Sequence, residues 1–351
     1  MESYEEEPWY KINNRQLVVI IMKNWNTKFF VFAPANICGG GPEALHQLVY
    51  YMRQLGMDAY TVYYVYSGFP VVSPVERYEQ YGVKVVRYNE IEDEVGNYVI
   101  APENAPWCLN GFRNAQKCIW WLGLIASKVS EGNSFYKMVY WKRRMMRQSV
   151  THARKLLYNV NNCWHLCGSK YAYLDVNNRY DKSRVEYMVE PISLDFLRMD
   201  NSDFSTKREN IVLYNPAKPS KIMGDLLERA RFKYVPLKGF TPDGLAEMYK
   251  EAKLYVDFGD FGGPERMPKE AVYFGCNILV ANHNAASNDF DVAIPQKYKV
   301  DDNETAEQIE YRIADMLQNY EKQKMDFLPF KLKVEGLEEN FINQLKNVFG
   351  R

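Results

Sequence analysis

The alternation of apolar strands with charged or amphipathic helices constrains this chain most, and it is clearest between Lys253 and Ala281. There an apolar strand, 254–258, leads into a glycine-rich turn, a charged helix start and a second apolar strand, 277–281. This order is typical of βαβ units in a parallel sheet. In open sheets of this kind ligands bind where strands end and helices begin, because free backbone N–H groups there attract anions.

The same alternation occurs on both sides of a polar segment, 198–210, which we interpret as a linker. Apolar, strand-like segments precede it at 28–33, 59–65, 83–88, 98–101, 117–122 and 163–167, and follow it at 211–214, 233–237, 254–258 and 277–281. The second set is separated by helical patterns near 219–230, 241–252 and 267–275. The sequence therefore predicts an α/β protein with two Rossmann-like domains that face each other across a cleft. We expect these domains to span 1–200 and 201–330, with a C-terminal helix at 331–351 packing back on the first domain.

Composition narrows the classes of function. A length of 351 residues with 47% hydrophobic and 15% aromatic residues fits two folded domains. A formal net charge of +0 argues against nucleic acid as a partner. No apolar run approaches the roughly 20 residues that cross a bilayer, and the acidic start of the chain does not resemble a secretory signal. A cytoplasmic location is therefore expected.

The six cysteines are scattered through apolar or strand-like segments. Cys163 and Cys167 are four residues apart with His165 between them, but no second ligand pair follows at the spacing of a zinc site. The sequence thus predicts no metal site, and this cysteine usage fits a reducing compartment.

Three glycines, Gly39, Gly40 and Gly41, lie between the first strand and its helix, followed by Pro42 and Glu43. Glycines let a backbone approach a ligand closely, and proline suits a first helical turn. The loop is a candidate for wrapping a diphosphate or its attached sugar. The alternative is a tight strand–helix turn without a ligand, because the run lacks the spacing of a dinucleotide or P-loop fingerprint.

Two further groups of charged residues follow strands of the second domain. Lys218 and Lys221 could neutralise a diphosphate at a helix start, or could be exposed loop lysines. Glu265, Arg266 and Glu270 cluster after the glycine turn at 259–263. Pro268 fits a first helical turn, which would place Glu270 near the third helical position, where a glutamate is often only a cap. The functional alternative is a carboxylate that binds a ribose diol.

These motifs together resemble the GT-B glycosyltransferases, and most closely the retaining, family-four-like group (group 1). The resemblance rests on GGGPE, YNPAKPSK, LKGFTPDGLAEMYKEAKLYVDFG and GPERMPKEAVYFGC. It extends over nearly the whole chain, is most specific over 211–300, and points to bacterial proteins of capsule, exopolysaccharide or lipopolysaccharide biosynthesis.

The resemblance implies a metal-independent, retaining transfer of a sugar from a nucleotide-diphosphate-sugar donor to a glycan or lipid-linked acceptor, with no cofactor. By position, Lys218 and Lys221 resemble the basic pair on the diphosphate and Glu270 resembles the ribose-binding carboxylate. The loop at 39–41 would face the donor, and Glu265 and Arg266 are the candidate catalytic residues beside it.

The sequence departs from the pattern of the group at two places. Gly262 stands where a glutamate normally precedes Glu270 by eight residues, so Glu265 is the candidate substitute. Trp120–Gly123 occupies the strand end where related enzymes carry a histidine near the reacting sugar. His165 is the alternative candidate for this catalytic role, although a histidine within a strand is usually a core residue. Retention versus inversion stays open. So do two rival functions, a non-catalytic nucleotide-sugar or glycan-binding relative and a GT-B sugar-nucleotide epimerase.

One basic stretch gives a further expectation. The segment 132–174 has eight lysines and arginines but no acidic residue, and apolar residues recur at helical spacing within 135–155. This pattern is typical of a helix that docks on an anionic membrane or captures a lipid-diphosphate acceptor. A core-packed helix with a solvated basic face is the alternative. The first interpretation predicts a protein peripheral to the inner face of the cell membrane.

Overall fold

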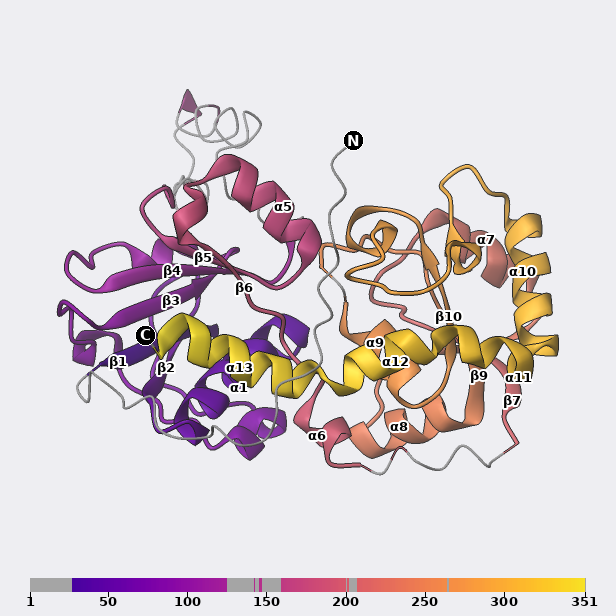
Figure 1. The fold of residues 1–351 in the computed structure, drawn as a ribbon, viewed down its shortest axis with the longest axis horizontal. Coiled ribbons are helices and arrows are strands. Elements are labelled where there is room, and N and C mark those ends of the chain that lie inside the picture. Colours follow the sequence, from indigo (N-terminus) through magenta and orange to yellow (C-terminus); the bar gives the residue numbers. More distant parts are fainter. Residues whose placement is uncertain are drawn as a thin grey trace, which may run out of the picture.

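The protein consists of two α/β domains, each built on a parallel sheet with helices on both faces (Figure 1). This computed structural model describes residues 27–124, 142, 145–146, 159–199, 201, 207–263 and 265–350. The first sheet has the strand order β2-β1-β3-β4-β5-β6, and the second has the order β11-β10-β9-β7-β8. Every described ladder in both sheets is parallel. The predicted fold, two Rossmann-like domains, is confirmed.

The first domain contains most of the strand-like segments that precede the linker. Its strands are β1 (Lys28–Pro34), β2 (Asp58–Tyr64), β3 (Tyr98–Pro102), β4 (Gln116–Trp121), β5 (Trp164–Cys167) and β6 (Val185–Tyr187). Its main helices are α1 (Gly40–Gln54), α5 (Lys170–Arg179) and α6 (Leu194–Leu197). The apolar run 29–33 of β1 is buried throughout because helices cover both faces of the sheet.

The second domain repeats the strand–helix order. Its strands are β7 (Glu209–Tyr214), β8 (Lys233–Pro236), β9 (Ala252–Asp257), β10 (Asn277–Ala281) and β11 (Lys299–Val300). Its helices are α7 (Lys221–Arg229), α8 (Pro242–Glu251), α9 (Arg266–Tyr273) and α10 (Ala306–Gln318). Side chains of Ser220 and Thr241 cap α7 and α8, which explains where these helices begin.

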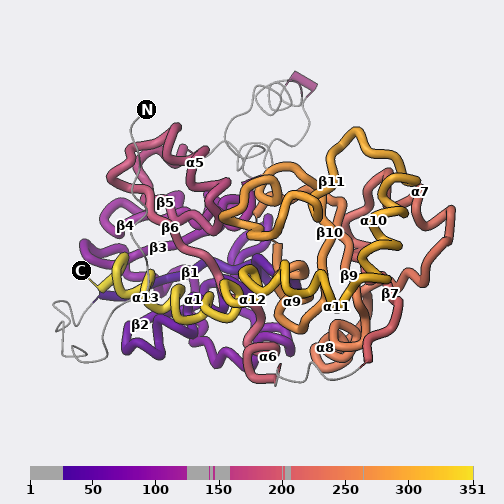
Figure 2. The backbone as a smooth tube through the Cα atoms, turned by 45° about the vertical axis from the view of Figure 1, so that its right-hand side comes forward, coloured from indigo at the N-terminus to yellow at the C-terminus, as the bar shows by residue number. Residues whose placement is uncertain are grey.

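The C-terminal helices connect the two domains (Figure 2). After α11 (Tyr320–Gln323), α12 (Leu328–Glu335) packs on α9, and α13 (Leu337–Phe349) crosses to the first domain. There Phe341 stacks on Trp120 with ring centroids 5.9 Å apart, and Tyr51 donates a 2.6 Å hydrogen bond to Glu338. None of the described helices is long and apolar enough to cross a membrane.

One predicted strand is wrong. Residues 83–88 form no strand; Val85 makes only an isolated bridge to Thr61 of β2. The backbone of Thr61 accepts from Val86 N and donates to Lys84 O, and the chain then turns into a 3-10 helix at Tyr88–Glu90. Apolar β-branched residues favour an extended backbone, but they do not specify how many residues pair. The basic helix expected at 135–155 lies outside the described residues, except for Lys142, Met145 and Met146.

The loops that follow the strands of the two sheets touch at the domain junction. Leu124 N donates a 2.8 Å hydrogen bond to Gly262 O, which joins the segments after β4 and β9. Asp291 of the second domain accepts hydrogen bonds from Lys170 N (2.7 Å) and Tyr171 N (2.9 Å) at the start of α5. These hydrogen bonds hold the carboxyl ends of the two sets of strands against each other.

Candidate active site between the domains

The predicted glycine loop forms the start of α1. Gly39 N donates to Tyr78 Oη (2.8 Å), and Tyr78 Oη donates back to Gly39 O (3.0 Å). A Cβ atom on Gly40 would lie 2.9 Å from Cδ of Arg266, whereas one on Gly41 would meet only Leu122 Cδ1 at 3.8 Å. The absence of a side chain at position 40 is therefore required by the close approach of an arginine from the other domain.

Arg266, predicted from the cluster in the second domain, crosses the junction. Its side chain is 9% exposed, its Nη1 lies 3.1 Å from Glu43 Oε2, and its Nη2 donates a 2.5 Å hydrogen bond to Gln47 Oε1. Glu43 and Gln47 are one turn apart on α1 and face the same side. A single guanidinium therefore binds two side chains of the first domain inside the protein.

The carboxylate of Glu43 is surrounded by hydrogen-bond donors and arginines. Its Oε1 accepts from Tyr81 Oη (2.7 Å) and Ser193 Oγ (2.6 Å), and Arg77 lies 3.7 Å from its Oε2. Burial opposes ionisation, but the charges of Arg266 and Arg77 and these hydrogen bonds hold the pKa of Glu43 below its usual range. Glu43 is thus a charged partner for Arg266.

Glu270 occupies the second turn of α9. The helix begins at Arg266, so Glu270 is its fifth residue and not the third, as the sequence suggested. Its side chain is buried, and burial raises its pKa to about 7 although the nearby Arg266 opposes this rise. A helix cap acts within the first turn, so the capping interpretation does not fit this position.

Glu265 and Lys218 form an ion pair at the mouth of the junction. Lys218 Nζ lies 2.5 Å from Glu265 Oε2, and about a quarter of each side chain is exposed. Glu265 precedes α9 with a left-handed φ of 28°, an uncommon conformation for a glutamate that turns the chain into the helix. Burial raises the pKa of Glu265, and Lys218 opposes this effect.

Lys221 is the first residue of α7 and is exposed. Lys218 lies on the segment between the strand β7 and this helix, so the two lysines are close in sequence at the helix start. The structure thus places the predicted pair at one strand end, with Lys218 engaged by Glu265 and Lys221 facing solvent.

The structure places His165 in the interior of the first sheet. Its Nδ1 accepts a 3.1 Å hydrogen bond from Trp121 Nε1, and its ring stacks on Tyr180 with centroids 4.1 Å apart. Burial lowers its pKa to about 4. No contact within the described part of the chain joins it to Glu265 or Arg266, so the structure does not bring this predicted residue to the others.

Sequence reasoning missed two charged residues at the junction, Glu103 and Glu190. Glu103 follows β3, and its Oε2 accepts a 3.1 Å hydrogen bond from Leu122 N. Burial raises its pKa to about 7 despite this bond, and the nearby Glu190 adds to the rise. Glu190 pairs with buried Lys269 of α9 at 3.2 Å, and its other oxygen, Oε2, has no hydrogen-bond partner in the part of the chain that the structure describes. A charged residue immediately after an apolar strand was the available signal.

The domain junction combines positively charged side chains with carboxyl groups whose pKa values are close to 7. Arg266, Lys269 and Lys218 supply cations, and Glu103 and Glu270 have pKa values close to 7. Such a site can stabilise an anionic leaving group and exchange a proton at neutral pH. Within the described ranges, no three His, Cys, Asp or Glu side chains gather as metal ligands would.

Neither a protein-family model nor a curated protein sequence matches this chain. Solved structures do match its fold. Sucrose-phosphate synthase from Thermosynechococcus elongatus aligns with a TM-score of 0.60 and 12% identity, over 92% of this chain and 98% of that one. A glycosyltransferase from Rickettsia africae gives 0.58 and 12%, over 91% and 98%.

A third structure, T4 phage BGT in complex with UDP and Mn²⁺, aligns with a TM-score of 0.55 and 8% identity, over 93% of this chain and 100% of that one. Identities this low show the fold and leave the activity open. The chain has the two-domain GT-B fold of these glycosyltransferases.

Proposed function

We propose that this protein is a glycosyltransferase that moves a sugar from a nucleotide-diphosphate-sugar donor to a glycan or lipid-linked acceptor. The observation that carries the proposal is the meeting of Arg266 and Glu43 across the domain junction, beside the glycine loop, in a GT-B fold. In open α/β sheets ligands bind at the carboxyl ends of strands, and both sheets present those ends here.

The donor diphosphate would lie against the second domain. Lys218 and Lys221 bracket the start of α7, where backbone N–H groups and the helix dipole add positive potential. Lys218 would exchange its ion pair with Glu265 for the diphosphate, which releases Glu265 towards the reacting sugar. Glu270, carried over by position from the group that the sequence resembles, is our candidate for the ribose.

The reaction joins the acceptor oxygen to the anomeric carbon of the donor while the bond from that carbon to the diphosphate oxygen breaks. The diphosphate leaves with the bonding electron pair, and the cations at the junction stabilise the negative charge that develops. In a retaining transfer, which we propose without a metal, the departing diphosphate takes the acceptor proton. Closure of the junction excludes water, so transfer is favoured over hydrolysis.

Glu103 supports a second stereochemical outcome. It belongs to the first domain, is buried beside Leu122 N, and has a pKa near 7, as a general base at neutral pH requires. If Glu103 took the acceptor proton from the face opposite the diphosphate, the product would be inverted. Proton NMR of the glycoside product, whose anomeric centre does not mutarotate, distinguishes the two outcomes.

The class of acceptor follows from the sequence resemblance to polysaccharide-building proteins. We propose an acceptor of a surface polysaccharide, reached by a cytoplasmic protein at the inner face of the membrane through the basic segment 135–155, most of which lies outside the described residues. A vesicle co-sedimentation with and without anionic lipid tests this contact separately from the chemistry.

Activity is tested with UDP-, GDP-, TDP-, CDP- and ADP-sugars and purified lipid-linked or glycan acceptors, with release of the nucleoside diphosphate as the readout. The proposal expects release that requires an acceptor and persists in EDTA. Without an acceptor, conversion of the donor into an intact nucleotide sugar of changed configuration, with no net release of diphosphate, would identify the epimerase, and binding without any turnover would identify the non-catalytic relative. Gly262, in the place of the usual glutamate, is the feature that favours the latter.

A further inference from the structure

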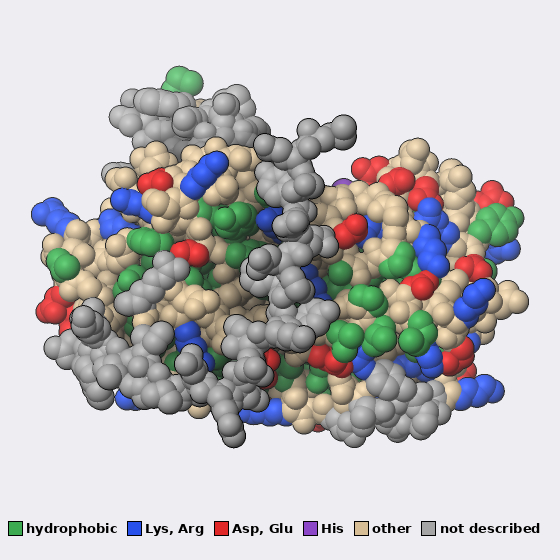
Figure 3. Space-filling model, viewed as in Figure 1, with side chains coloured by type: hydrophobic (Ala, Val, Ile, Leu, Met, Phe, Trp, Pro, Cys, Tyr) green, Lys and Arg blue, Asp and Glu red, His purple; other side chains and the backbone are tan. Residues whose placement is uncertain are grey.

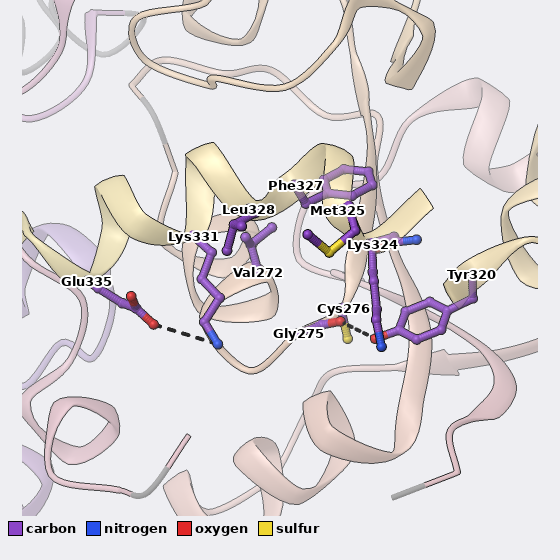
Figure 4. A pocket seen from close by; sticks show the side chains of 11 residues that line it. Val272, Gly275, Cys276, Tyr320, Lys324, Met325, Phe327, Leu328, Lys331 and Glu335 are labelled. Atoms are coloured by element: carbon purple, nitrogen blue, oxygen red, sulfur yellow. Dashed lines mark hydrogen bonds and ion pairs between the residues drawn. The ribbon is translucent and has the colours of Figure 1, made fainter. Parts of the chain in front are cut away.

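A cavity lies on the far side of the second domain, away from the domain junction. It has a volume of about 400 Å³ and is formed by the end of α9, the start of β10, and the helices α11 and α12 (Figure 4). Gly275 and Cys276 precede the strand β10 and Asn277 begins it, so they lie at the opposite end of that strand from the junction. The cavity is within the size range of small-molecule sites.

The cavity wall is apolar and its surroundings expose more apolar surface. Val272, Met325, Phe327 and Leu328 line the cavity, and Figure 4 shows their side chains gathered around its middle. Met325 (59% exposed) and Leu328 (40% exposed) also reach solvent. Figure 3 shows hydrophobic side chains gathered over the part of the second domain where α12 lies. Contiguous exposed apolar side chains around a cavity are typical of a binding site.

Lysine side chains line the cavity, and an arginine lies beneath its floor. Lys331 lines the cavity with Glu335, whose Oε1 is 3.6 Å from Lys331 Nζ; Lys324 also lines it and is paired with Glu321, which lies outside the lining. Beneath the floor, Arg208 donates to the carbonyls of Tyr249, Ala252 and Phe274, and no carboxylate in the described part of the chain forms an ion pair with it. A buried guanidinium held only by carbonyls leaves a net positive charge.

The floor also contains an unsatisfied amide. Asn277 lines the cavity and is 1% exposed, and among the described residues neither its Nδ2 nor its Oδ1 has a hydrogen-bond partner. A buried donor without a partner costs free energy that an acceptor brought by a ligand would recover. The amide of Asn277 and the guanidinium of Arg208 make the floor the polar side of the cavity.

We propose that this cavity binds a monomeric amphiphile with an alkyl chain and an anionic carboxylate head, the chemistry of a fatty acid. The chain would occupy the space between Val272, Met325 and Leu328, where flexible methionine adapts to an alkyl ligand. The carboxylate would lie on the positive side of the cavity, near Lys331 and the floor at Asn277. The proposal does not depend on the glycosyltransferase function, because the two sites lie at opposite ends of β10.

Isothermal titration with decanoate, kept below its micelle concentration, tests this proposal on the full chain. We expect saturable 1:1 binding of decanoate and none of decyltrimethylammonium, which has the same chain and the opposite charge. Leu328→Trp, which fills the cavity, should weaken binding by at least about tenfold. Leu332→Trp is the matched control, because Leu332 is exposed on the same helix and does not line the cavity.

Two charge variants test the position of the head. Lys331→Met should weaken decanoate binding, and Glu335→Gln should strengthen it, because the glutamate competes for Lys331. Equal binding of both amphiphiles, or equal loss in the two tryptophan variants, would overturn the proposal. Binding to anionic vesicles without binding of monomeric decanoate would identify the apolar surface as a membrane contact and would also overturn it. Unchanged binding in Lys218→Ala is expected, because that residue lies at the junction.

Discussion

Arg266 and Glu43 come from different domains, yet Nη1 of the arginine lies 3.1 Å from Oε2 of the glutamate in the interior of the protein. The pair links α9, which carries the candidate site of the second domain, to α1, which begins with the glycine loop. The domain junction is thus held by a buried charge pair as well as by packing. The candidate site and the interdomain contact share the same residues.

Removal of Arg266 alone should be strongly destabilising. In Arg266→Met, Glu43 stays buried between Tyr81 and Ser193 without its main counter-charge, which costs about 3–5 kcal/mol in typical buried pairs. Glu43→Gln/Arg266→Met should recover much of this loss. Urea unfolding of both single variants and of the double variant measures the coupling. Additive effects of the two substitutions would show that the pair does not act as a unit.

Gly40→Ala and Gly41→Ala form a matched pair of variants. A methyl group at position 40 would lie 2.9 Å from Arg266 Cδ and should displace the arginine, at a cost of about 1–3 kcal/mol. The same change at position 41 meets only an ordinary contact at 3.8 Å, and alanine favours the helix. Thermal unfolding should therefore show a lower Tm only for Gly40→Ala. A similar Tm for both variants would contradict the close approach.

Glu270 should make stability depend on pH. Its folded pKa of about 7 exceeds that of an unfolded glutamate, so between about pH 4.5 and 7 the folded state binds more protons. Stability from this residue is therefore present at low pH and decreases as pH rises towards 7, by at most about 3 kcal/mol. Glu270→Gln should reduce this decrease. Unfolding at pH 5 and at pH 8 measures it, and an unchanged difference would show that Glu270 does not titrate in this range.

Asp291 should connect the domains through the backbone of α5. Its two oxygens accept from Lys170 N and Tyr171 N, so Asp291→Ala leaves two donors at a helix start without partners, a loss of roughly 1–2 kcal/mol. Hydrogen exchange of these two amides should accelerate. Asp289→Ala is the control, because Asp289 is exposed and pairs with Lys299 within its own domain. Equal protection of the amides in both variants would exclude this role.

The fold could be predicted because the βαβ pattern repeats in short, local segments. The residues of the loop at 39–41 and of the cluster at 265–270 were found for the same reason. The partners of Arg266 could not be predicted, because Gln47 is 219 residues away in the sequence and no local pattern indicates that the two side chains meet. Glu103 and Glu190 follow strands, but only the assembled junction shows that they are buried together. His165 was a plausible candidate because of its residue type. The sequence does not show that its ring packs against Trp121 and Tyr180, away from the other candidate residues.

The central claim is that the junction binds a nucleotide diphosphate through the lysines that follow β7. Calorimetric titration of UDP, GDP, TDP, CDP and ADP into the wild type, Lys218→Ala, Lys221→Ala and Lys233→Ala tests it most directly. Lys233 is the control, because it is exposed at the opposite end of the sheet, where β8 begins. We predict that one diphosphate binds the wild type and Lys233→Ala equally, and binds Lys218→Ala and Lys221→Ala at least about tenfold more weakly. Binding of no diphosphate at millimolar concentration, or equal binding by all four proteins, would contradict the account.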